Sequence, residues 1–352
     1  MDLLRIMLNG QRIFRYIFSA AMRMLCPAPG YRKMKIPFFL FFLMLPPVLP
    51  SDASLQDAIG LYEKGKFAQA ANVFQQLSAS TPSNAEAWVW LSKSRLKARD
   101  WDKAVQALEK AVQLQPANAQ YHLLLGRACG SRASHSSFLT AMNWALRVVK
   151  EFETARKLAP ESIEVRFDLL DYYLNAPGIV GGGSEKAEAE AQVIAKLNPK
   201  KGYLARATIH IKNKKWDLAR KELAQAVVDS PQSVSANKDL ADFLLSRQDF
   251  EGALYYADKA LLLDAKSKRC RLIAAAAKTR LKSDLEAAAE TLHAFLAGTL
   301  GEGDPGFEEV YYWLGEYYLT KGEKGRAQEA FKAALAFDPE YSRAKDGLSK
   351  SQ

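Results

Sequence analysis

After about residue 51, small and apolar residues recur along the chain at spacings of three, four and three, which places them on one face of an α-helix. The pattern repeats about every 34 residues, as shown by Pro82 and Pro116 and again by Pro305 and Pro339. The residue at the end of each repeat, proline in most of them, is preceded by an aromatic residue at a distance of fifteen in four repeats and by alanine at a distance of twelve in six. Each repeat therefore predicts two helices, of which the second ends at the proline because proline cannot continue a helix.

The repeats predict an all-α solenoid over residues 54–352 and a separate segment over 1–53. We expect about eight two-helix units, the seventh of them degenerate because Asp284 stands where an aromatic residue belongs. The third unit is lengthened by an insertion and the fourth by a glycine-rich insertion. The predicted units are 51–84, 85–118, 119–162, 163–201, 202–233, 234–267, 268–307 and 308–341, followed by a capping helix within 342–352.

This pattern resembles the tetratricopeptide repeat, a helix–turn–helix unit of 34 residues, over about 51–341. The segment from Tyr311 to Pro339 matches nearly every signature position, and glycines such as Gly65 and Gly322 suit the turn between two helices. The resemblance implies a right-handed superhelix whose first helices line a concave groove. It also implies a scaffold that binds proteins or peptides, with no catalytic residues and no cofactor.

The first 53 residues have the composition of a targeting segment. Basic residues precede a charge-free run over 36–49, and Ser51-Asp52-Ala53 follows it. This order is typical of a secretory signal peptide cleaved after about Ala53, with translation starting at Met1 or at Met34. We therefore expect an exported protein in the periplasm of a Gram-negative bacterium. A transit peptide and an uncleaved membrane anchor facing the periplasm are the alternatives, and only the anchor implies contact with a membrane.

Charge and cysteine content exclude several classes of protein. The net charge is +10, and residues 1–53 carry half of it, so the repeats are nearly balanced and predict no nucleic-acid partner. Three cysteines in 352 residues cannot form a disulfide scaffold, and Cys129 and Cys270 are expected to be buried and unpaired. The four histidines are too scattered to form a metal site.

The partner-binding residues are predicted on the first helices of the units, where the family's groove lies. Basic residues occupy the N-terminal end of this surface and acidic residues the C-terminal end, which favours an extended or helical peptide bound in one direction. The alternative is a solvated helix face. The candidates are Trp90, Lys93, Lys97, Arg127, Phe167, Asp168, Asp171, Asp239, Asp242, Tyr312, Trp313 and Glu316.

Two other functions stay open from the sequence. A small-ligand or anion-binding protein, or an enzyme, could use the insertions at 130–137, which contains His135, and 178–184, whose glycines could offer free N–H groups. Their alternative interpretation is an extra helical turn and a widened turn capped by Ser184. A structural protein could instead self-associate through exposed terminal repeats. The sequence leaves the oligomeric state undecided.

Overall fold

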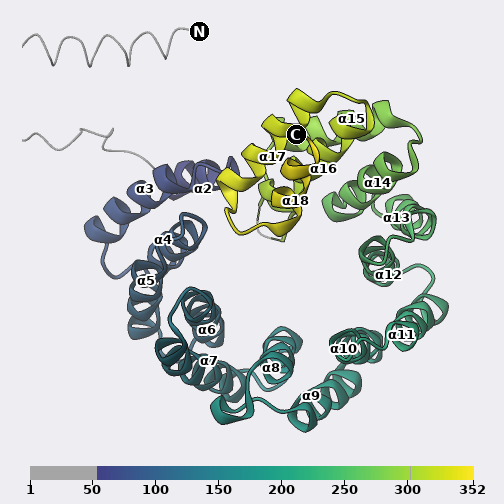
Figure 1. The fold of residues 1–352 in the computed structure, drawn as a ribbon. Helices are drawn as coiled ribbons and strands as arrows, with labels where there is room; N and C mark the ends of the chain where they lie inside the picture. Colours follow the sequence, from purple (N-terminus) through teal and green to yellow (C-terminus); the bar gives the residue numbers. More distant parts are fainter. Residues whose placement is uncertain (1–53, 302) are drawn as a thin grey trace, which may run out of the picture. The chain divides into compact units, whose positions relative to one another are not determined.

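The computed structural model describes residues 54–301 and 303–352, and within them it contains seventeen α-helices, one short 3-10 helix and no strand. The predicted targeting segment lies outside the described residues. Consecutive helices form antiparallel pairs, so the fold is an all-α helical repeat solenoid (Figure 1). No helix of the described part of the chain is long and apolar enough to cross a membrane.

The helices form eight pairs and a terminal helix. The pairs are α2 (Leu55–Glu63) with α3 (Phe67–Ser80), α4 (Ala85–Lys97) with α5 (Trp101–Leu114), α6 (Ala119–Ser134) with α7 (Phe138–Leu158), α8 (Ile163–Asn175) with α9 (Ser184–Leu197), α10 (Pro199–Lys212) with α11 (Trp216–Asp229), α12 (Val234–Ser246) with α13 (Phe250–Leu263), α14 (Lys268–Leu281) with α15 (Leu285–Ala297), and α16 (Phe307–Thr320) with α17 (Lys324–Phe337). The 3-10 helix η1 (Gly178–Val180) precedes α9, and α18 (Ser342–Lys350) ends the chain.

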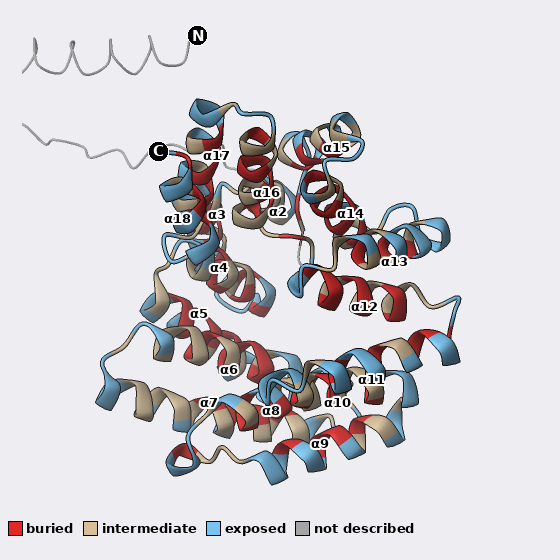
Figure 2. Ribbon diagram, turned by 45° about the vertical axis from the view of Figure 1, so that its right-hand side comes forward, coloured by how far each residue is buried: buried red, intermediate tan, exposed pale blue. Residues whose placement is uncertain are grey.

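The first helices of the pairs line the inner side of the solenoid and the second helices form its outer side (Figure 1). Glycine lets paired helices approach closely where an aromatic ring fills the interface. A Cβ on Gly126 of α6 would lie 2.4 Å from the ring of Phe152 on α7. Gly315 and Gly347 both abut the fully buried ring of Phe331. Figure 2 shows the buried residues on the faces that helices turn toward one another.

Both predicted insertions appear as local extensions of a helix pair. In the third pair α7 has 21 residues, and its first turn leaves Phe138 and Leu139 about three-quarters exposed. In the fourth pair the extra residues form η1 and the glycine turn before α9. In both of these units the sequence spacing exceeds 34 residues.

The first and last helix pairs contact each other, which a solenoid of neighbour-only contacts does not predict. The ring centroid of Phe67 on α3 lies 6.5 Å from that of Phe307 on α16 and 6.2 Å from that of Phe337 on α17. The backbone N–H of Leu300 donates to the carbonyl oxygen of Glu63 at 2.8 Å. Figure 1 shows α2 and α3 beside α16 and α17. We call this contact the seam.

Candidate functional site

A cavity of about 570 Å³ lies at the seam. The inner helices α4 and α6 form one wall, and the segment before α16, the start of α16 and the turn between α17 and α18 form the other. Tyr62, Leu96 and Leu124 contribute apolar surface to its lining. The sequence predicted a concave groove along the inner helices, and the contact between the two ends of the solenoid gives this part of the groove a second wall.

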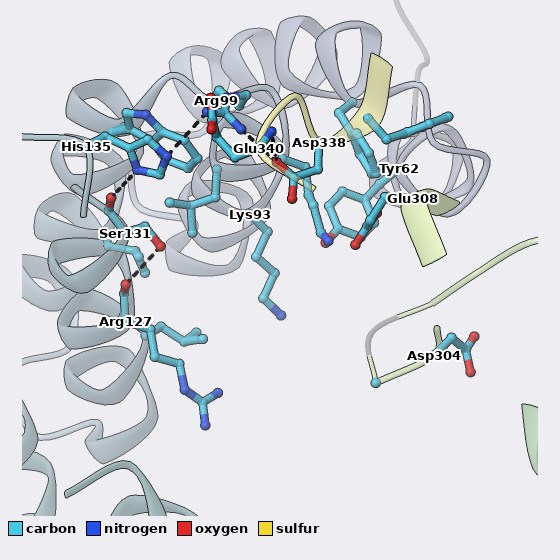
Figure 3. Close-up of a pocket in the computed structure, with 18 of the residues that line it drawn as sticks. Tyr62, Lys93, Arg99, Arg127, Ser131, His135, Asp304, Glu308, Asp338 and Glu340 are labelled. Atoms are coloured by element: carbon cyan, nitrogen blue, oxygen red, sulfur yellow. Dashed lines mark hydrogen bonds and ion pairs between the residues drawn. The ribbon is translucent and has the colours of Figure 1, made fainter. Parts of the chain in front are cut away.

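The wall on α4 and α6 is basic. Asn84 caps the N-terminus of α4, where its side-chain oxygen accepts hydrogen bonds from the backbone N–H groups of Glu86 and Ala87. Lys93 and Lys97 follow on α4, and their spacing of four places them on one face of the helix. Figure 3 shows the side chains of Lys93 and Arg127 extending toward the open space of the cavity.

Arg127 is fixed by two carboxylates of the next inner helix. Its Nε donates to Asp168 at 2.6 Å, and its Nη2 donates to Glu164 at 2.8 Å. Burial alone would lower the pKa of Arg127, but these hydrogen bonds and charges outweigh it and raise that pKa. Burial, followed by the nearby carboxylates of Glu164 and Asp171, raises the pKa of Asp168, although Arg127 acts to lower it. The guanidinium is therefore permanently charged and held at the cavity.

A polar cluster connects the two walls at the rim. The imidazole of His135 stacks on Trp101, with centroids 4.3 Å apart. Its Nδ1 lies 2.8 Å from the carbonyl oxygen of Ser131, and its Nε2 lies 3.3 Å from Nη2 of Arg99. A carbonyl oxygen can only accept and a guanidinium can only donate, so this geometry fits a neutral imidazole protonated on Nδ1. Arg99 also forms an ion pair at 3.0 Å with Asp338, which lines the cavity after α17.

The opposite wall is acidic. Asp304 accepts from the backbone N–H of Gly301 at 2.7 Å and pairs with Lys268 at 2.6 Å. Glu308 lines the cavity from the first turn of α16. Glu340 lies on the same side, where its hydrogen bond to Lys345 lowers the pKa of its carboxyl group. The cavity therefore separates charges of opposite sign.

A second hollow of about 640 Å³ continues along the inner face. It is lined by Trp90 and Tyr121, among others, and shares Lys93 and Arg127 with the seam cavity. Trp90 is half-buried, stacks on Phe74 and carries the ammonium group of Lys93 over its ring at 4.6 Å. Four predicted site residues, Trp90, Lys93, Lys97 and Arg127, thus lie on one connected surface.

The other predicted residues lie farther along the inner helices, and most of their charges are paired within the chain. Asp239 pairs with Lys238, Asp242 with Arg269 at 2.6 Å, and Glu316 with Arg280 at 2.7 Å. These pairs link successive inner helices or neighbouring residues. The acidic end predicted for the groove therefore stabilises the stack of repeats in this structure.

The remaining candidates divide between surface and core. Asp171 is exposed and accepts a hydrogen bond from the side chain of Asn175, whereas Phe167 packs partly buried against the core. Tyr312 is also half-buried, and burial raises its pKa to about 12. Trp313 is only 4% exposed, because it lies in the core around α14 and α16. The prediction that Trp313 lies on the surface of the groove is therefore wrong.

The glycine turn at 178–184 does not present the free N–H groups that its sequence suggested. The N–H groups of residues 180–183 all donate to backbone carbonyls, including Gly182 to Pro177 at 3.1 Å and Gly183 to Tyr173 at 2.9 Å. Ser184 is the first residue of α9, and Gly183 is its N-cap. The prediction that Ser184 caps this helix is therefore wrong. The turn is a structural connection between α8 and α9.

Several residues of the cavity were not predicted. Tyr62, Phe67, Glu308 and Asp338 meet the basic wall only because the chain closes on itself. One local signal existed in the sequence, since Gly65 takes a positive φ of 71° and a Cβ there would lie 2.9 Å from the ring of Phe307. Glycine at that turn was expected, but its contact with a residue more than 200 positions away was not.

Comparison with known proteins places the repeats in a family. Models described as tetratricopeptide repeat match residues 61–128, 204–268 and 308–341. No curated protein gives a significant match.

One of the solved structures that are similar to this chain, yeast Tom70, shows the same fold. Yeast Tom70 is 16% identical with a TM-score of 0.53, and the match covers 82% of this chain and 58% of that one. The APC/C hetero-tetramer Cut9-Hcn1 is 19% identical with a TM-score of 0.45, covering 86% and 56%. A tetratricopeptide repeat protein from Parabacteroides merdae is 15% identical with a TM-score of 0.44, covering 76% and 98%. The chain thus spans less than two thirds of the first two structures.

Proposed function

We propose that this chain, which is a tetratricopeptide repeat protein, is a non-enzymatic scaffold that binds a protein or peptide on the inner face of α4 and α6. Tetratricopeptide repeats are in general protein-interaction modules. The observation that carries the proposal is the connected surface formed by the two hollows, where the ring of Trp90 lines the same hollow as Lys93 and Arg127, and the Arg127 guanidinium is held in place by two carboxylates. Aromatic and arginine side chains in concave surfaces dominate the binding energy of many interfaces.

A photo-crosslinking experiment tests this assignment. A benzophenone amino acid at Gln120, which is exposed and lines the second hollow, should yield a defined adduct in intact cells. The matched control is the same replacement at Gln113, which is exposed on the outer helix α5. Equal yields at the two positions, or no adduct at Gln120, would contradict binding on the inner face.

We further propose that the protein is exported, functions in the bacterial envelope as part of an assembly there, and loses residues 1–53. The support is the basic, apolar and small-residue order of that segment. Mass spectrometry of the intact protein purified from its native cells tests the proposal. A mature chain starting near Ser54 in the periplasmic fraction is expected, whereas a chain starting at Met1 or Met34 in the cytosol would refute it.

Self-association through exposed terminal repeats is the less supported alternative. The terminal pairs contact each other within one chain, through Phe67, Phe307 and Phe337. Surface that is used in the seam is not available to a second copy while the seam is closed.

A further inference from the structure

We propose that the seam cavity is a binding site for a short peptide of about three residues with both termini free. This goes beyond the proposed scaffold function, because it needs no folded partner and uses residues from both ends of the solenoid. The carboxylate of the ligand would face Lys97, and its ammonium group would face Glu308.

Unpaired opposite charges on facing walls carry the inference. Among the residues that the structure describes, Lys97 and Glu308 each line the cavity and neither forms an ion pair. Arg127 and Asp304, by contrast, are paired with residues on their own sides of the cavity. A ligand with a negative and a positive end can satisfy Lys97 and Glu308 together, which an anion or a cation alone cannot do.

The size of the cavity sets the length of the ligand. A volume of about 570 Å³ is typical of small-molecule sites, and a sphere of that volume is about 10 Å across. Three residues of an extended peptide span about 10 Å. A peptide of about three residues matches this dimension, and a long polypeptide cannot place both of its termini inside.

The lining between the charged walls suits an aliphatic or aromatic side chain. Tyr62 and Phe67 come from the first helix pair, Phe337 comes from the last, and Leu96 and Leu124 complete the apolar surface. Because these residues belong to both sides of the seam, a bound peptide would also stabilise the contact between the two ends.

Titration calorimetry with the tripeptide Ala-Leu-Ala tests the proposal on the purified chain. Binding should weaken at least about fivefold when the peptide is amidated at its C-terminus, and similarly when it is acetylated at its N-terminus, because each change removes one charge-assisted contact. Undetectable binding of Ala-Leu-Ala, or equal affinity for all three peptides, would overturn the proposal.

Matched variants assign each end of the peptide to its wall. In K97M the amidated and free peptides should bind alike, while acetylation still weakens binding. In E308Q the acetylated and free peptides should bind alike, while amidation still weakens binding. K157M is the control, because Lys157 is exposed on α7 and lies outside the cavity. If K97M and E308Q keep the full preference for free termini, the site lies elsewhere. Crosslinking at Gln120 reports independently on the scaffold function, so failure of one proposal leaves the other standing.

Discussion

Replacing Phe67 by alanine should open the seam while leaving the solenoid folded. The Phe67 ring is half-buried and makes edge-to-face contacts with Phe307 and Phe337 across the seam. Truncating a fully buried phenylalanine to alanine lowers the free energy of unfolding by about 3–5 kcal/mol. Because Phe67 is only partly buried, we expect its truncation to lower the free energy of unfolding by about 2 kcal/mol. Much of this loss falls on the seam, because the cross-seam rings lose their partner.

The amide of Leu300 reports directly on this change. Its N–H donates to the carbonyl oxygen of Glu63 across the seam, so it exchanges with solvent when the seam opens. If the full loss of about 2 kcal/mol falls on the seam, and the seam recloses faster than the open amide exchanges, the hydrogen exchange of this amide accelerates by about 30-fold. The measurement is amide exchange followed by mass spectrometry of a peptide containing Leu300.

The matched control is Phe138→Ala, since Phe138 is 76% exposed at the start of α7. It should leave the exchange of Leu300 unchanged. Unchanged exchange in Phe67→Ala, with normal helical content, would refute the reasoning that Phe67 holds the seam. Loss of helical content in Phe67→Ala would show instead that Phe67 stabilises the whole solenoid.

Two further predictions concern packing and buried thiols. Gly315→Ala should lower the free energy of unfolding by about 1–3 kcal/mol, because the new Cβ would lie 2.4 Å from the ring of Phe331. Gly325→Ala should raise the free energy of unfolding by about 0.5–1 kcal/mol, because nothing lies within 4 Å of the new Cβ and alanine favours the helix. Urea denaturation measures both, and equal effects would contradict the packing argument. Burial raises the pKa of Cys129 to about 12, so its thiolate fraction at pH 8 is about 10⁻⁴. A thiol reagent should therefore modify Cys129 only after the chain unfolds. Rapid labelling of Cys129 in the folded chain would contradict its burial.

The sequence was sufficient for the repeat architecture because local patterns specify it. Aromatic residues such as Phe67 and Trp101 begin second helices, as predicted from their distance to the prolines. The sequence spacing departs from 34 residues in the third and fourth units, where α7 has 21 residues and η1 precedes α9. These features depend on contacts within one repeat or between neighbouring repeats. Such contacts produce the periodic pattern of apolar residues in the sequence.

The candidate site was predicted only in part because burial depends on the neighbouring repeat. Trp90 and Trp313 occupy equivalent positions in their units, each directly before a leucine. The inner helix before Trp90 is the short helix α2, and Trp90 stays half-exposed. The inner helix before Trp313 is α14, which packs beside α16 and contributes to the core that buries Trp313. The seam was beyond prediction, since it depends on the accumulated twist of all eight units, several of them irregular.

The contact between the first and last helix pairs is the central claim, because it forms the cavity. Distance measurement between two spin labels tests it most directly, with one label at Ala68 on α3 and the other at Ala336 on α17, both exposed next to the seam rings. We predict a single short distance with a narrow distribution, which broadens in Phe67→Ala. A long, broad distribution in the otherwise unmodified chain would show that the solenoid is open and that the cavity does not exist in solution.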